Sequence, residues 1–232
     1  MLEPVADRSF SIIKNKFGIP EENIILSCTH THAAPDAGQE GAGSAQWLQS
    51  YYKQLPVAVE AALRDLDPVE GAFTGKAEQP GIGFVRRYLL ANGTWKMNPG
   101  MSDKPVEHES EADPEMRTIR FDRKNKKDVL LVNFQTHYYG ANNKYPNQFS
   151  ADFVAPFRES AQREFDCLFA YYSGASGDIN QTARLPSDNK VPDADAAFMN
   201  GARNCLRNEQ KVSLGKIKIQ HSEYFASCKI DS

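Results

Sequence analysis

The sequence predicts an α/β fold, a mixed sheet with flanking helices and with active-site loops at the strand ends. Three observations support this prediction. Helical and extended patterns alternate along the 232 residues, 41% of the residues are apolar and can build a core, and no internal repeat or linker divides the chain. We therefore expect residues 1–232 to belong to one domain.

Four helices are predicted from apolar residues at helical spacing. Ser44 and Ser150 are expected to cap the second and third helices, and Pro56 is expected to kink the second. Gly18-Ile19-Pro20 and Asp67-Pro68 are expected to end the first two helices. The predicted helical ranges are 5–17, 44–66, 150–165 and 193–207.

Short apolar or alternating runs predict the strands. The runs at 116–121 and 128–135 flank a polar stretch and are expected to pair, and Asn92-Gly93 is expected to form a hairpin turn. The polar stretch 99–114 is expected to be a loop. The predicted strands cover 23–28, 69–77, 83–90, 116–121, 128–135, 167–172 and 211–220.

Composition excludes several classes of function. The 27 basic and 30 acidic residues are interspersed and give a net charge of −3, so no nucleic-acid partner is expected. No run approaches the roughly 20 apolar residues that cross a bilayer, and the N-terminal residues do not resemble a signal peptide. The four cysteines form no C-x-x-C pair, which excludes a zinc ribbon and favours buried free thiols.

Three histidines follow predicted strands and indicate a metal site. In Thr29-His30-Thr31-His32, alternation along an extended chain would point both imidazoles to one side, and His137 directly follows the strand 128–135. Neutral imidazole suits zinc, and a catalytic zinc takes three protein ligands and a water. A hydrolytic zinc site is the functional hypothesis; hydrogen-bonded or surface histidines are the alternative.

The other two histidines are interpreted differently. His108 lies in the acidic stretch "PVEHESEADPE" and is expected to be solvated. His221 stands next to Glu223 and Tyr224, so a second metal cluster is conceivable there, with a surface position as the alternative.

A turn rich in small and polar residues follows the strand 167–172. Gly174 and Gly177 permit close backbone approach, while Ser173, Ser176 and Asp178 offer polar groups. This segment is either a substrate-binding loop, with Ser173 and Asp178 as contacts, or an ordinary turn. It lacks the G-x-S-x-G spacing, so a serine triad is not supported.

Four ordered motifs resemble the catalytic domain of the neutral or alkaline, non-lysosomal ceramidases: "ILSCTHTHAAP", "VNFQTHYYG", "SADFVAPF" and "YYSGASGDIN". The resemblance implies that His30 and His137 bind zinc and that His32 lies beside the metal and stabilises the transition state. An arginine near the reacting carbonyl corresponds to Arg86 or Arg87, and the sequence leaves the choice between them open.

The chain departs from the family pattern at several places. The family's glutamate and tyrosine ligands come from a downstream segment, and Glu223 and Tyr224 do not lie in a matching context. Asn180 stands where the family has a serine, which excludes a covalent serine mechanism at that position. The resemblance runs from about residue 19 to 184, so the chain is expected to be a partial catalytic domain that binds zinc weakly and turns over slowly.

The resemblance implies a zinc-dependent amide hydrolase that uses a zinc-activated water to split N-acylsphingosine into sphingosine and a fatty acid. Two alternatives are an inactive homologue that binds a lipid or glycan, and a zinc hydrolase of another small amide or ester. The implied substrate is a lipid amide, with peripheral membrane contact in the complete protein and a secreted, periplasmic or membrane-associated location. The oligomeric state is left open.

Overall fold

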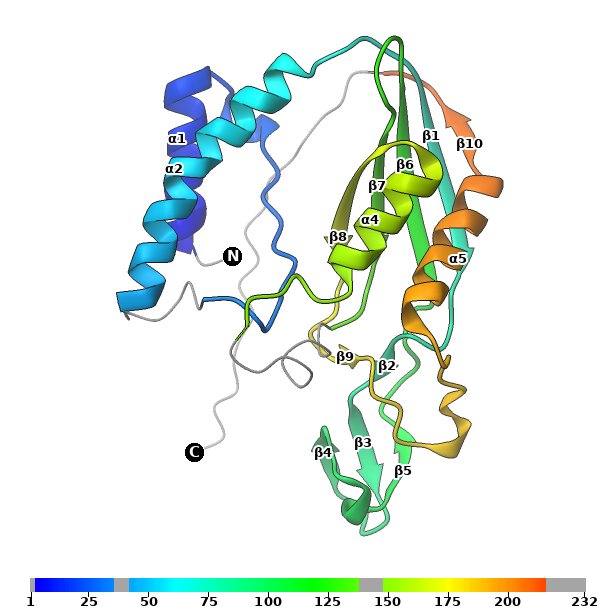
Figure 1. The fold of residues 1–232 in the computed structure, drawn as a ribbon. Helices are drawn as coiled ribbons and strands as arrows, with labels where there is room; N and C mark the ends of the chain where they lie inside the picture. Colours follow the sequence, from blue (N-terminus) through cyan, green and yellow to red (C-terminus); the bar gives the residue numbers. More distant parts are fainter. Residues whose placement is uncertain (1–2, 36–41, 138–147, 216–232) are drawn as a thin grey trace.

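A mixed sheet forms the centre of the fold in this computed structural model, which describes residues 3–35, 42–137 and 148–215. Within that part of the chain its five strands lie in the order β10-β1-β6-β7-β8 (Figure 1). Only β7 and β8 run parallel; the other neighbours are antiparallel. The α/β prediction is confirmed. The strands are β1 Val69–Glu78, β6 Glu115–Arg123, β7 Val129–Phe134, β8 Leu168–Ser173 and β10 Gln210–Val212.

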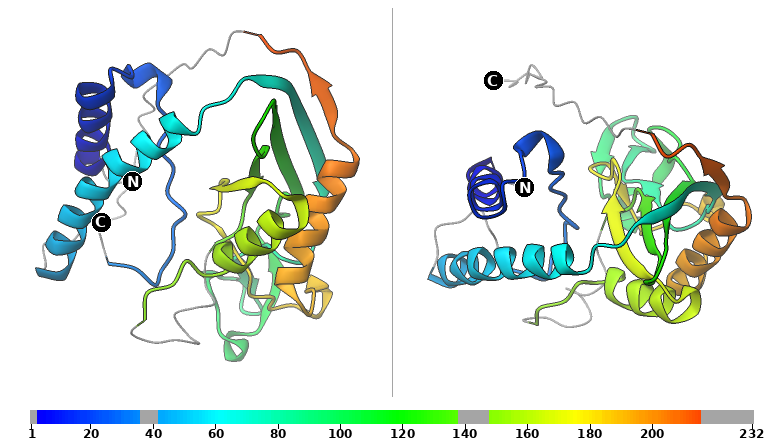
Figure 2. Two further views of the ribbon diagram at one scale, coloured as in Figure 1. Left: turned by 45° about the horizontal axis from the view of Figure 1, so that its top comes forward. Right: turned by 90° about the horizontal axis from the view of Figure 1, so that it is seen from above.

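Helices α4 (Val154–Phe165) and α5 (Ala194–Arg207) cover one face of this sheet (Figure 2). Four phenylalanines hold the layers together. The Phe198 ring stacks on Phe153 with 4.3 Å between centroids and also meets Phe157 and Phe134. A Cβ at Gly75 would overlap the Cys205 carbonyl, so only glycine lets α5 lie this close to β1.

Helices α1 (Glu3–Phe17) and α2 (Ala42–Arg64) pack on each other and lie apart from the sheet, beyond β8 (Figures 1 and 2). The hydroxyls of Ser9 and Tyr51 lie 3.0 Å apart across their contact. The first helix is confirmed. The second begins before Ser44, so the prediction of Ser44 as its cap is wrong, and Pro56 lies inside it.

Two small sheets extend from the end of the central one (Figure 1). The predicted strand 83–90 is split at Arg86 into β2 (Phe84–Val85) and β3 (Arg87–Leu90). β2 pairs with β9 (Ile179–Asn180), whereas β3 pairs with β4 (Trp95–Met97) and β5 (Pro105–His108). The hairpin turn at Asn92-Gly93 is confirmed, with Gly93 at φ 81°.

The prediction of a loop over 99–114 is wrong in part, because this stretch contains a short 3-10 helix (Met101–Asp103) and the strand β5. Among the described residues, β5 is an edge strand whose main chain pairs only with β3. Such a strand needs no apolar face of its own, so it does not show the hydrophobic pattern by which strands are predicted.

The buried strand predicted over 23–28 is also wrong. A 3-10 turn (Glu21–Asn23) begins this segment, and the residues that follow have no strand partner within the described part of the chain. Ile24 is buried, but Ile25 and Cys28 are exposed. A short apolar run identifies a strand only when another strand lies beside it, and that depends on the tertiary structure.

The second half of the chain follows the prediction more closely. β6, β7, β8 and α5 are confirmed, and the Asp193 side chain caps α5 by accepting the Ala196 N–H at 3.0 Å. α4 begins four residues after Ser150, so Ser150 does not cap it; its hydroxyl accepts the Asp152 N–H instead. The strand predicted over 211–220 is present only in β10, and 216–220 lie outside the described residues.

The expectation of buried free thiols holds for Cys167 and Cys205 but not for Cys28, which is free and exposed; Cys228 lies outside the described residues. None of the helices within 3–35, 42–137 and 148–215 is long and apolar enough to span a membrane.

Candidate metal centre

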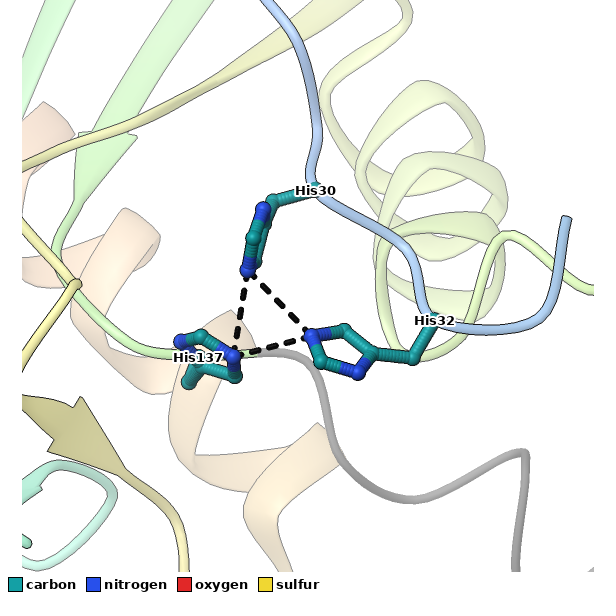
Figure 3. Close-up of side chains that lie close together, drawn as sticks. All are labelled: His30, His32 and His137. Atoms are coloured by element: carbon teal, nitrogen blue, oxygen red, sulfur yellow. Dashed lines mark hydrogen bonds between the residues drawn. The ribbon is translucent and has the colours of Figure 1, made fainter. Parts of the chain in front are cut away.

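Three histidines from distant parts of the chain meet at one point (Figure 3). The Nε2 atoms of His30 and His137 lie 3.1 Å apart, those of His30 and His32 3.2 Å, and those of His32 and His137 2.9 Å. His137 is buried, whereas His30 and His32 are exposed. The centre is therefore closed on the His137 side and open to solvent on the other.

His137 lies three residues after β7, which ends at Phe134, and hydrogen bonds hold it in place. The hydroxyl of the preceding residue, Thr136, donates to the Ile82 carbonyl at 3.1 Å. The His137 Nδ1 lies 3.1 Å from the Ser176 carbonyl, which can only accept, so Nδ1 carries the proton. The neutral ring therefore directs the lone pair of Nε2 toward the other two histidines.

His30 and His32 converge for a reason other than the expected strand alternation. His30 adopts φ 57°, in the left-handed region, so the segment bends at this residue. The Thr31 hydroxyl donates to the Ser150 carbonyl at 2.7 Å, and the Ser150 N–H donates to the Ala33 carbonyl at 2.9 Å. The expected convergence is present, but a turn fastened to Ser150 produces it.

The geometry of the three nitrogens fits a metal ion. Tetrahedral coordination with metal–nitrogen bonds of about 2.0 Å places ligand atoms about 3.3 Å apart, close to the observed separations. The lone pairs of Nε2 atoms that lie this close repel one another unless a proton or a cation lies between them. Within the described residues, these three side chains could hold a metal ion.

The protonation of the histidines also favours metal binding. Partial desolvation of the ring lowers the pKa of His30, and electrostatic repulsion by His32 and Arg86 lowers it further. Burial likewise lowers the pKa of His137, against the opposing effect of the Ser176 hydrogen bond, and His30 and Arg86 add to the decrease. Both imidazoles are therefore neutral at pH 7, the form that binds a metal.

Arg86 and Arg87 occupy different environments. The Arg86 Nη2 donates to the Gly177 carbonyl at 2.5 Å, next to the Ser176 carbonyl that holds His137. Arg87 pairs with Glu109 at 2.9 Å and lies over the Trp95 ring, on the exposed small sheet. Of the two arginines that the sequence could not separate, Arg86 is the one beside the histidines.

The loop after β8 lies beside the centre, although Ser173 and Asp178 do not touch the histidines by hydrogen bonds. The Ser173 hydroxyl lies 3.2 Å from that of Ser176. Asp178 is exposed, and its carbonyl accepts the Arg86 N–H at 2.7 Å. Asp178 also lines a cavity of about 340 Å³ with Asn133 and Gln135.

Asn180 serves the fold. Its side-chain amide donates to the Asn98 side chain at 2.9 Å, and its side-chain oxygen accepts the Thr182 N–H. The residue is buried in β9 and links the two small sheets.

His108 contradicts the expectation of a solvated side chain. Its ring is half-buried, with Nδ1 2.6 Å from the Val85 carbonyl and Nε2 2.5 Å from the Asp188 carboxylate. Local sequence could not show this, because Asp188 lies 80 residues away. His221, Glu223 and Tyr224 fall outside the described residues, so the idea of a second metal cluster stays a prediction.

The fold is similar to the crystal structure of the neutral ceramidase from Pseudomonas aeruginosa, with a TM-score of 0.62 and 15% sequence identity. The similarity covers 88% of this chain and 34% of that chain. No protein-family model and no curated protein sequence matches this chain. At this identity the likeness shows a shared fold, and the chain spans about a third of the ceramidase's length.

Proposed function

We propose that this chain carries part of the active site of a zinc-dependent amide hydrolase of the ceramidase type. The observation that carries the proposal is the convergence of three Nε2 atoms within 3.2 Å of one another, beside a buried backbone carbonyl that fixes the tautomer of His137. The shared fold with a neutral ceramidase supports the same conclusion.

Zinc fits this donor set because neutral imidazoles are among its preferred ligands, and a catalytic zinc keeps one position open for water. When bound, zinc lowers the pKa of that water toward neutrality and so supplies a nucleophile for an amide carbonyl. His30 and His137 would hold the ion. The His32 Nε2 lies 3.2 Å from that of His30 and 2.9 Å from that of His137, and His32 is either a third ligand or, as the resemblance implies, a neighbour that stabilises the transition state.

Arg86 is the candidate for stabilising the charge that develops on the amide oxygen. Its guanidinium uses one nitrogen to bind the Gly177 carbonyl, and its Nε has no hydrogen-bond partner among the described residues. A preorganised donor of this kind typically contributes about 2.7 to 4 kcal/mol to lowering the barrier. Ser173 and Asp178 are proposed as substrate contacts on the neighbouring loop, with a long-chain lipid amide as the substrate.

Metal analysis tests the centre directly. The 232-residue chain, stripped with a chelator and titrated with Zn²⁺, is expected to bind about one ion, because three imidazole nitrogens face one point. His30→Ala and His137→Ala should lose this binding. His32→Ala should also lose it if His32 is a third ligand, and should keep it if His32 only stabilises the transition state. Arg87→Gln, on the exposed sheet, is the control. Zinc binding that is unchanged in both His30→Ala and His137→Ala would rule out the proposed centre.

Hydrolysis assays then test the substrate class. The zinc-loaded chain is assayed with a long-chain N-acyl amide, a short-chain amide and an ester. Arg86→Gln should lower kcat by about 10² to 10³, whereas Arg87→Gln should not. Cleavage of short amides or esters alone would favour a hydrolase of small substrates, and lipid binding without cleavage would favour an inactive homologue.

A further inference from the structure

The His108–Asp188 pair lies outside the three-histidine centre and connects three segments of the chain. His108 ends β5, Val85 ends β2, and Asp188 ends the short 3-10 helix Pro186–Asp188. The side chains of His108 and Asp188 are only 20% and 4% exposed. A half-buried imidazole that uses both nitrogens in hydrogen bonds to different segments holds those segments in a fixed relation.

The protons of this pair follow from its partners. The Val85 carbonyl can only accept, so His108 Nδ1 donates to it. The second Asp188 oxygen accepts the N–H groups of Arg184 at 2.6 Å and Leu185 at 2.8 Å. A single proton then lies between His108 Nε2 and the first Asp188 oxygen, and the pair is neutral overall whichever atom carries it.

Aromatic rings fix the orientation of the imidazole. Tyr88, the cross-strand partner of His108, lies with its ring centroid 4.4 Å from the imidazole, and Phe84 stacks at 6.4 Å. Tyr88 is almost fully buried. The ring of His108 therefore cannot turn away from Val85 without displacing packed neighbours.

The carbonyl that His108 holds belongs to the residue just before Arg86. The Arg86 backbone is fixed on both sides, since its N–H donates to the Asp178 carbonyl and its own carbonyl accepts the Asn98 N–H, each at 2.7 Å. The guanidinium then reaches the Gly177 carbonyl, next to the carbonyl that orients His137. A continuous set of contacts thus runs from Asp188 through His108 and Arg86 to the metal centre.

We propose that His108, oriented by Asp188, is a positioning residue that aims Arg86 at the three-histidine centre. This inference rests on the proposed function for its catalytic consequence. Without the His108 bond, the Val85 carbonyl loses its side-chain partner, and the Arg86 segment, still bonded to Asp178 and Asn98, is held less tightly relative to Gly177. Removing the His108 bond should lower kcat but leave zinc affinity unchanged, because the three histidines are held by other contacts.

Two substitutions separate the two bonds of His108. Asparagine places its amide nitrogen near the position of Nδ1 and can still donate to the Val85 carbonyl. Glutamine places its nitrogen near that of Nε2 and can reach Asp188 but not Val85. If His108 positions Arg86, His108→Gln should lower kcat more than His108→Asn does. If His108 only fastens the 184–188 loop, His108→Asn should lower kcat more.

The first measurement needs neither metal nor activity. Hydrogen exchange is followed in the full 232-residue, metal-free chain at the Arg86 and Asn98 amides and, for comparison, at amides of the β6–β7 ladder. His108→Gln should speed exchange at the first two by about tenfold or more and leave the ladder unchanged. Unchanged exchange at Arg86 and Asn98, or equal acceleration everywhere, overturns the positioning role.

The second measurement is a double-mutant cycle on amide hydrolysis by the zinc-loaded chain. His108→Gln should lower kcat with little change in KM, and adding it to Arg86→Gln should lower kcat no further. Additive losses would overturn the proposal, since His108 would then act independently of Arg86. If the wild-type chain binds no zinc, the proposed function fails, and the exchange experiment still decides whether His108 positions Arg86.

Discussion

His30 shows how a single residue shapes the candidate site. Its φ of 57° lies in a region that residues other than glycine seldom adopt, and such conformations persist only where surrounding contacts impose them. Here the bonds between Thr31, Ala33 and Ser150 supply those contacts. The residue with this strained backbone is also a candidate metal ligand, so the strain lies at the candidate site.

The lowered pKa of His30 and His137 predicts how stability changes with pH. Both groups have a pKa below the ordinary value of 6.5 in the folded chain, so the unfolded chain takes up protons first as the pH falls. The free energy of unfolding of the metal-free chain should therefore decrease below about pH 6.5. Denaturant unfolding at several pH values measures this.

The His30→Gln/His137→Gln double variant serves as the control, since it lacks both titrating rings. Its free energy of unfolding should depend less on pH between 7 and about 5 than that of the wild-type chain. Identical pH dependence in the two proteins would show that these rings are not held neutral by the fold.

Among the elements, α5 is the best example of a helix whose sequence pattern and packing agree. Its range was predicted from local sequence as 193–207, and the structure confirms the helix, with Asp193 as its N-cap. By contrast, 23–28 and 105–108 were misassigned, because the first lacks a neighbouring strand in the described part of the chain and the second acquires one. Strand assignment depends on a partner more than helix assignment does.

The packing of α4 and α5 on the sheet predicts a large effect at Phe198. This ring is fully buried against Phe153, Phe157 and Phe134. Phe198→Ala should lower the free energy of unfolding by about 3 to 5 kcal/mol, because it leaves a cavity in the core. Phe149→Ala, at an exposed position, is the matched control and should change it little. Equal effects in denaturant unfolding would contradict this packing.

At the scale of the whole molecule, the candidate site exists only in the folded chain. His30 and His137 are 107 residues apart in sequence, and Arg86 and Gly177 are 91 apart. The unfolded chain cannot hold these groups together, so a metal that binds them binds the folded state in preference and stabilises it.

Zinc should therefore raise the Tm of the 232-residue chain. At a free concentration 100 times Kd, binding to the folded state alone adds about 2.7 kcal/mol to the free energy of unfolding. Thermal unfolding with and without Zn²⁺ measures the shift, which should vanish in His137→Ala and persist in Arg87→Gln. Equal shifts in wild type and His137→Ala would mean that zinc binds elsewhere.

The sequence by itself determined the α/β class, most helices and central strands, and the three histidines of the centre, because local periodicity or a short motif predicts each of them. Only the tertiary structure decided that a turn brings His30 and His32 together, that Arg86 rather than Arg87 bonds to the loop beside the centre, and that His108 is bonded to Asp188. These features depend on contacts between residues that are distant in sequence, and local patterns carry no information about which distant groups will meet.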